Sequence, residues 1–80
     1  MPPLPTSDEY LARFKDVAAK EPEFDASSFE NLRVKTMEVC DKIEYPFRAS
    51  NFIIECMHVM AKQATDRSKV PWPFNGLTLS

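Results

Sequence analysis

The fold is decided by the stretch Phe52-Ile53-Ile54-Glu55-Cys56-Met57-His58-Val59-Met60. On a helix that turns by about 100° per residue, its apolar side chains cover more than half of the circumference. The polar strip that remains carries Asn51, Glu55, His58 and Lys62. A helix that is apolar this far round is typically central and buried against several neighbours. The stretch therefore predicts a helix that is buried at the centre of an all-α protein, with enough apolar surface to engage a second subunit.

Two further helices precede this stretch, and each has its own start signal. Thr6-Ser7-Asp8-Glu9 and Ser27-Ser28-Phe29-Glu30 both place a hydroxyl three residues before a carboxylate, the pattern of a capping box. The prolines Pro22 and Pro46 disfavour helix at the residues before them. The sequence therefore predicts a three-helix bundle with helices at about 7–20, 28–44 and 48–67. The start of the third helix is left open between Pro46 and Ser50.

Both ends of the chain differ in composition from the helices. We expect residues 1–80 to form one small domain, because 80 residues rarely hold two. Residues 1–5 hold three prolines and predict a flexible N-terminus. Residues 68–80 predict an extended C-terminal arm, since Pro71 and Pro73 favour extended backbone. A hairpin around Asn75-Gly76, pairing Trp72 and Phe74 with Leu77 and Leu79, is the less favoured alternative because proline disrupts pairing.

Composition argues against several classes of protein. Hydrophobic residues make up 44% of the chain, too many for a disordered protein, and no apolar run approaches the ~20 residues that span a bilayer. A net charge of −2 disfavours nucleic acid as the main partner. The first residues hold no basic segment and no long apolar one, so we do not expect them to be a secretory signal. Cys40 and Cys56 lie in different predicted helices, whose axes pack ~8–10 Å apart, so we expect reduced thiols and a cytoplasmic protein.

The sequence contains one weak motif for a metal site. Glu55 and His58 fit the Glu-x-x-His spacing of di-iron bundles, and Glu38, Asp41 or Glu44 could supply further carboxylates across a dimer. However, Glu55 and His58 lie on the polar strip, opposite the predicted core. With one histidine and one glycine in the chain, neither a histidine cluster nor a phosphate-binding glycine loop is available. We therefore predict no catalytic residues and no cofactor, and keep the metal protein as an alternative.

Apolar and aromatic residues outside the predicted core stripes point to protein partners. Tryptophan is common among residues that dominate interface energies, and an extended, proline-rich segment loses little entropy when it docks. We expect a non-enzymatic interaction module, such as a small adaptor, inhibitor or regulatory subunit, that is a homodimer through its third helix. The arm could dock within the chain, on a second subunit or on another protein. The predicted partner-binding residues are Phe52, Val59, Met37, Trp72 and Phe74.

Overall fold

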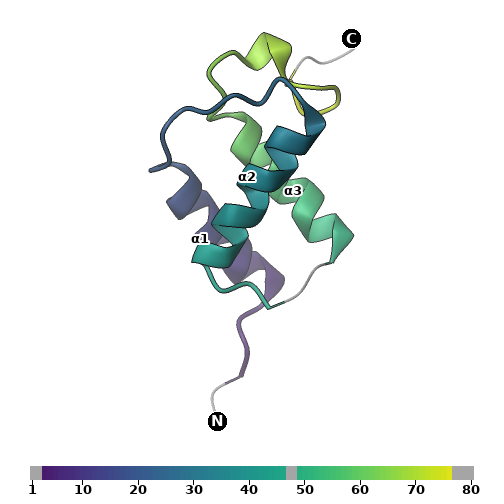
Figure 1. Ribbon diagram of the computed structural model, residues 1–80. Helices are drawn as coiled ribbons and strands as arrows, with labels where there is room; N and C mark the ends of the chain where they lie inside the picture. Colours follow the sequence, from purple (N-terminus) through teal and green to yellow (C-terminus); the bar gives the residue numbers. More distant parts are fainter. Residues whose placement is uncertain (1–2, 47–48, 77–80) are drawn as a thin grey trace.

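Three helices pack against one another, each contacting the other two. The computed structural model describes residues 3–46 and 49–76. The helices are α1 (Ser7–Ala18), α2 (Phe29–Lys42) and α3 (Ser50–Ala61), followed by the 3-10 helix η1 (Arg67–Lys69). In the view of Figure 1, α2 crosses in front, between α1 and α3. The all-α three-helix bundle is confirmed, and its helix bounds lie inside the predicted ones.

Side-chain caps begin the first two helices: Thr6 caps α1 as predicted, whereas α2 is capped by Ser28, one residue after the Ser27 of the predicted capping box. The Thr6 hydroxyl oxygen accepts a hydrogen bond from the Glu9 backbone N–H at 3.2 Å, and Ser28 accepts from the Asn31 N–H at 3.0 Å. Each bond satisfies one of the backbone donors that a helix start leaves unpaired. α3 begins without a side-chain cap, after Ala49. The predicted start at residue 48 lies outside the described residues.

The core lies where the three apolar stripes meet. Phe14 of α1, Leu32 and Val39 of α2, and Met60 of α3 are fully enclosed. Cys40 and Cys56 are free thiols with no exposed surface, in agreement with the sequence. Burial of apolar side chains on this scale is the dominant favourable contribution to folding.

Helix α3 ends at Ala61, six residues before the predicted end at 67. After Ala61 the backbone tightens into turns: the N–H groups of Lys62 and Gln63 donate to carbonyls three residues earlier. The Thr65 N–H then donates to the Phe24 carbonyl at 3.0 Å. This contact with the α1–α2 connector gives the backbone a partner outside the helix. The helical periodicity of one segment cannot reveal a hydrogen-bond acceptor that lies far away in the sequence.

The C-terminal arm is folded into a turn rather than extended. After η1 in the sequence, the Phe74 N–H donates to the Pro71 carbonyl at 2.9 Å, and the Trp72–Pro73 peptide bond is cis. Val70 and Phe74 are buried, whereas Trp72 is 68% exposed. The turn brings both buried side chains back onto the bundle. Residues 77–80, including the predicted hairpin partners Leu77 and Leu79, lie outside the described residues, as do residues 1 and 2 of the N-terminal segment.

One glutamate connects the end of α1 to α2. The Glu21 carboxylate lies 2.7 Å from the Lys42 ammonium and 3.5 Å from that of Lys35. These contacts, with the Lys42 hydrogen bond foremost, lower the pKa of Glu21 below its ordinary value. The Glu21 side chain is only 10% exposed, so water screens it less than an open surface pair.

Helix α2 stops in a left-handed turn. Glu44 has a φ of 55°, a region that L-residues with a side chain rarely adopt. The following N–H, of Tyr45, reaches back to the Cys40 carbonyl at 3.1 Å. This is a common way to end a helix, although glycine is the usual residue at the left-handed position.

Candidate functional site

An apolar groove runs between α2 and α3. We call it the α2–α3 groove; its volume is about 350 Å³, and it is lined by Phe29, Arg33, Met37, Ser50, Ile53, Ile54 and Met57. Phe29 is 52% exposed and Ile54 is 46% exposed, although both are large and apolar. Clustered exposed apolar side chains of this kind mark interaction sites more often than single ones do.

Helical spacing builds both walls of the groove. Phe29, Arg33 and Met37 follow one another at intervals of four residues, so they lie on one face of α2. On α3, Ile53 and Met57 share the same spacing. The groove is therefore formed by two regular helices, which position its side chains more rigidly than loops would.

One residue of the α2 wall, Arg33, belongs to an ion pair. The Arg33 guanidinium donates to Glu30 at 2.8 Å, one helical turn away. The hydrogen bond from Arg33 lowers the pKa of Glu30, and the same bond raises the pKa of Arg33. Both groups stay charged at neutral pH, so Arg33 brings a positive charge to the groove, and its partner Glu30 lies one turn earlier on α2, outside the lining.

Aromatic side chains continue this surface at the start of α2. The rings of Phe29 and Phe74 lie 6.1 Å apart, and the His58 ring lies 4.6 Å from that of Phe74. The arm thus folds onto its own chain through Phe74. Trp72, two residues earlier, is left largely exposed.

The five residues predicted to bind a partner are spread over different parts of the bundle. Met37 lines the α2–α3 groove, Phe74 lies against Phe29, and Trp72 is exposed on the arm. Phe52 is buried, with 6% of its surface exposed, and Val59 is half-buried beside α1. Met37 and Phe74 are therefore linked through Phe29, whereas Phe52 and Val59 lie outside that surface.

Sequence reasoning missed Phe29, Ile53 and Ile54 as members of this surface. Phe29 shares the helical phase of the α2 core stripe, yet it is the first residue of the helix and half of its surface is exposed. Ile54 was recognisable as the edge of an apolar arc too wide for two neighbours. Only the packed arrangement shows that Ile54 and Met37 face the same groove.

The Glu-x-x-His pair lies on the surface. Glu55 and His58 are both exposed, and the His58 ring packs against Phe74. Over residues 3–46 and 49–76, no three His, Cys, Asp or Glu side chains gather closely enough to hold a metal ion. Within one chain, the carboxylates expected to complete such a site, on Glu38, Asp41 and Glu44, do not converge on this pair.

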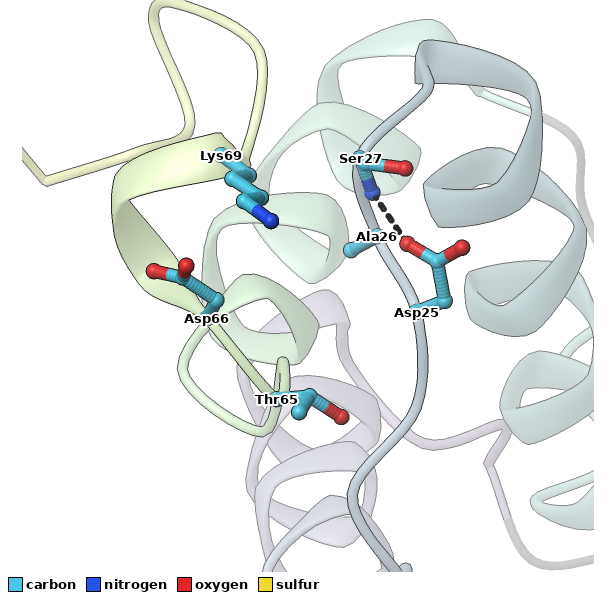
Figure 2. Close-up of a pocket in the computed structure, with 6 residues that line it drawn as sticks. All are labelled: Asp25, Ala26, Ser27, Thr65, Asp66 and Lys69. Carbon is cyan, nitrogen blue, oxygen red and sulfur yellow. Dashed lines mark hydrogen bonds between the residues drawn. The ribbon is translucent and has the colours of Figure 1, made fainter.

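A second hollow, of about 280 Å³, lies between the α1–α2 connector and η1, and five of its six lining residues have polar or charged side chains (Figure 2). Asp25 accepts a hydrogen bond from the Ser27 N–H at 2.9 Å, and Asp66 accepts from the Ser68 N–H at 3.0 Å. Hydrogen bonds from Ser27 and Ser68 hold the pKa values of the two carboxyls below their ordinary range. Figure 2 shows the two carboxylates on opposite sides of the hollow, so they do not form a converging acid–base pair.

The chain matches no protein-family model, no curated protein and no solved structure. Among the described residues, no helix has both the length and the apolar character needed to cross a bilayer. The groove and the exposed arm residue Trp72 are therefore interpreted from their own geometry.

Proposed function

We propose that this protein is a non-enzymatic interaction module of the cytoplasm, acting as a small adaptor, inhibitor or regulatory subunit. It binds apolar side chains in the α2–α3 groove, and its first partner is a second copy of itself. The observation that carries the proposal is the exposure of Phe29 and Ile54 on the walls of one groove.

Size supports a second copy as the occupant. A core built from about 80 residues rarely supplies more than ~3–5 kcal/mol of stability, and subunit association is a common supplement. Two bundles that meet groove to groove would remove Phe29, Ile53 and Ile54 of both chains from water. Each buried aliphatic or aromatic side chain contributes roughly 1.5–3 kcal/mol when it is fully transferred.

The charges beside the groove support the same occupant. In a twofold dimer the same patch meets itself, so the patch must be complementary to its own copy. Arg33 lines the groove and Glu30 lies one turn earlier on α2, beside it, which allows Arg33 of one chain to approach Glu30 of the other. Such a pair guides association more than it strengthens it.

Trp72 offers a second contact for a partner. Its side chain is 68% exposed on a turn whose neighbours Val70 and Phe74 are buried. A tryptophan held on a fixed turn loses little entropy when it is covered. The groove and Trp72 together give the module an apolar face and an aromatic anchor.

The experiment is sedimentation equilibrium over a range of protein concentrations, with native mass spectrometry to count subunits and detect any bound metal. We compare the wild type with Ile54→Glu. The matched control is Val34→Glu, which places the same charge on an equally exposed apolar site of α2, 44% against 46%, outside the groove. We expect Ile54→Glu to weaken the dimer about tenfold or more and Val34→Glu to leave it within about threefold.

Three results would count against the proposal. A wild-type protein that is monomeric at every concentration removes the second copy as the partner. Equal weakening by the two variants removes the groove as the interface. A dimer that binds metal and loses it in His58→Ala moves the function to the alternative class of carboxylate–histidine metal proteins.

A further inference from the structure

The C-terminal arm presents one tryptophan to solvent beside the α2–α3 groove. Trp72 is the only tryptophan of the chain, and 68% of its surface is exposed. Two residues later, the Phe74 ring lies 6.1 Å from the ring of Phe29, which lines the groove. Figure 1 shows the yellow turn of the arm next to the start of α2. The exposed indole and the groove are therefore neighbouring surfaces of one chain.

Trp72 does not fill the groove of its own chain. A side chain seated there would be largely covered, whereas most of Trp72 is exposed. Its neighbours in the turn, Val70 and Phe74, are buried, and the Phe74 ring lies 4.6 Å from the His58 ring. These contacts hold the turn in place. A side chain that occupies the groove must therefore come from another molecule.

The charged residue of the groove suits an aromatic occupant. The Arg33 guanidinium donates two hydrogen bonds to Glu30, at 2.8 and 3.3 Å, and its side chain is 46% exposed. Glu30 takes these bonds at one edge of the planar group. The flat faces of a guanidinium stack on aromatic rings, with tryptophan the most favourable partner.

The other lining residues match an indole as well. Met37 and Met57 supply thioether sulfurs, which make favourable contacts with ring edges. Ser50 supplies a hydroxyl, which can accept a hydrogen bond from an indole N–H. The volume of about 350 Å³ is at the small end of ligand-site volumes, ~300–1,000 Å³, and suits one large side chain. An aliphatic occupant would use neither the guanidinium face nor the hydroxyl.

We propose that Trp72 of each copy occupies the α2–α3 groove of the other copy in the dimer. This inference rests on the proposed self-association through the groove, and it names the side chain that the groove receives. In a twofold dimer, each chain gives and receives the same contact. Because the indole and the groove are neighbours on one chain, two identical contacts form together. Tryptophan is enriched among the residues that dominate interface energies.

The test mixes two variants that each lose one half of the contact. Ile54→Glu damages the groove and keeps Trp72, whereas Trp72→Ala keeps the groove and leaves a chain without tryptophan. A homodimer of either variant has no intact contact, but the mixed dimer has one. Trp72→Ala is titrated into a fixed, low concentration of Ile54→Glu while the fluorescence emission of Trp72 is recorded. We expect the emission to move to shorter wavelengths, and the mixed dimer to be about tenfold or more tighter than either homodimer.

Two further titrants are the matched controls. Trp72→Ala combined with Ile54→Glu offers a damaged groove and should produce no shift in emission. Trp72→Ala combined with Val34→Glu carries the same charge at an exposed site outside the groove and should produce the full shift. Equal shifts from these two titrants would overturn the proposal, because Trp72 would then be covered by another surface. Mixing that gives no dimer tighter than the homodimers would overturn it too.

The wild type gives a second readout, which does not depend on whether a variant folds. Its Trp72 emission is recorded over the concentrations at which sedimentation equilibrium detects the dimer. We expect the emission to shift together with the dimer fraction. A dimer that forms without any change in emission would overturn this inference alone and leave the groove to other side chains of the second copy. A protein that stays monomeric at every concentration overturns both this inference and the second copy as the partner.

Discussion

The Tyr45 ring stacks on the Phe52 ring, with centroids 3.9 Å apart and planes inclined by 20°. Tyr10 of α1 meets Tyr45 edge-on at 5.1 Å. Three aromatic side chains from α1, the α2–α3 connector and α3 therefore close one end of the bundle. Desolvation in this cluster raises the pKa of Tyr45. The cluster makes Phe52 a residue of the core.

Replacing Phe52 should therefore cost stability. We expect Phe52→Ala to lower the free energy of unfolding by about 3–5 kcal/mol, because it removes a buried ring and leaves a cavity. Val34→Ala is the control, since Val34 is 44% exposed, lies outside the groove and should cost less than about 1 kcal/mol. Urea unfolding followed by circular dichroism measures both. Equal losses in the two variants would show that Phe52 does not belong to the core.

The left-handed turn at Glu44 offers a stabilising substitution. We expect Glu44→Gly to raise the free energy of unfolding by about 0.5–1 kcal/mol, because glycine adopts a positive φ without a steric penalty. Glu38→Gly is the control, placed at an exposed site inside α2, where glycine should cost about 1 kcal/mol. Thermal unfolding distinguishes the two by the sign of the change in Tm. A lower Tm for Glu44→Gly would argue against the strained turn.

Acid should weaken the link between α1 and α2. The folded-state pKa of Glu21 lies below its ordinary value of 4.5, so the Glu21 contacts stabilise the fold above that pH. This stabilisation disappears as the pH falls through the lowered, folded-state pKa. We expect Glu21→Gln to be less stable than the wild type at pH 7 by about 1 kcal/mol or less, with the difference shrinking below pH 4.5.

The control for this prediction is Glu23→Gln, an exposed carboxylate in the same connector. Urea unfolding at a series of pH values gives the stability of each variant. A difference between Glu21→Gln and the wild type that stays constant from neutral to acidic pH would show that the carboxylate does not act through its charge.

Substitutions of the two aromatic residues of the arm should have different effects, one on the stability of the fold and the other on self-association. Phe74→Ala should lower the free energy of unfolding by about 2–4 kcal/mol, because Phe74 is buried against Phe29 and His58. Trp72→Ala should change it by less than about 1 kcal/mol, because Trp72 is exposed. Any weakening of self-association by Trp72→Ala then reflects the surface and not the fold. A large loss of stability in Trp72→Ala would contradict this division.

The fold could be predicted because its determinants are local. The cap at Thr6, the serine pair Ser27-Ser28, and the prolines at 22 and 46 mark helix ends through contacts within a few residues, although Ser28 rather than Ser27 is the cap of α2. The core stripes follow from helical spacing, since Tyr10 and Phe14 of α1 are buried as expected. Such features depend on backbone geometry that any helix shares.

The candidate site could be predicted only in part, because it depends on how helices meet. Met37 was recognisable, since it lies off the core stripe of α2. Phe29 follows the periodicity of the core but is 52% exposed, because it lies on a wall of the α2–α3 groove, and periodicity does not show where two packed helices leave a groove between them. The split between Phe74 and Trp72 arises from a turn that the prolines alone do not specify. The metal, dimer and partner hypotheses remain predictions for the experiments above.

The hydrogen bond from the Thr65 N–H to the Phe24 carbonyl has a consequence for solvent exchange. Thr65 is exposed and belongs to no helix, so its local structure would not protect its amide from exchange with deuterium. Its partner comes from a connector far away in the sequence. Protection of this one amide therefore requires the connector and the end of α3 to stay together. Slow exchange of the Thr65 amide therefore reports that these two segments are packed together, and fraying at the end of a single helix does not change it.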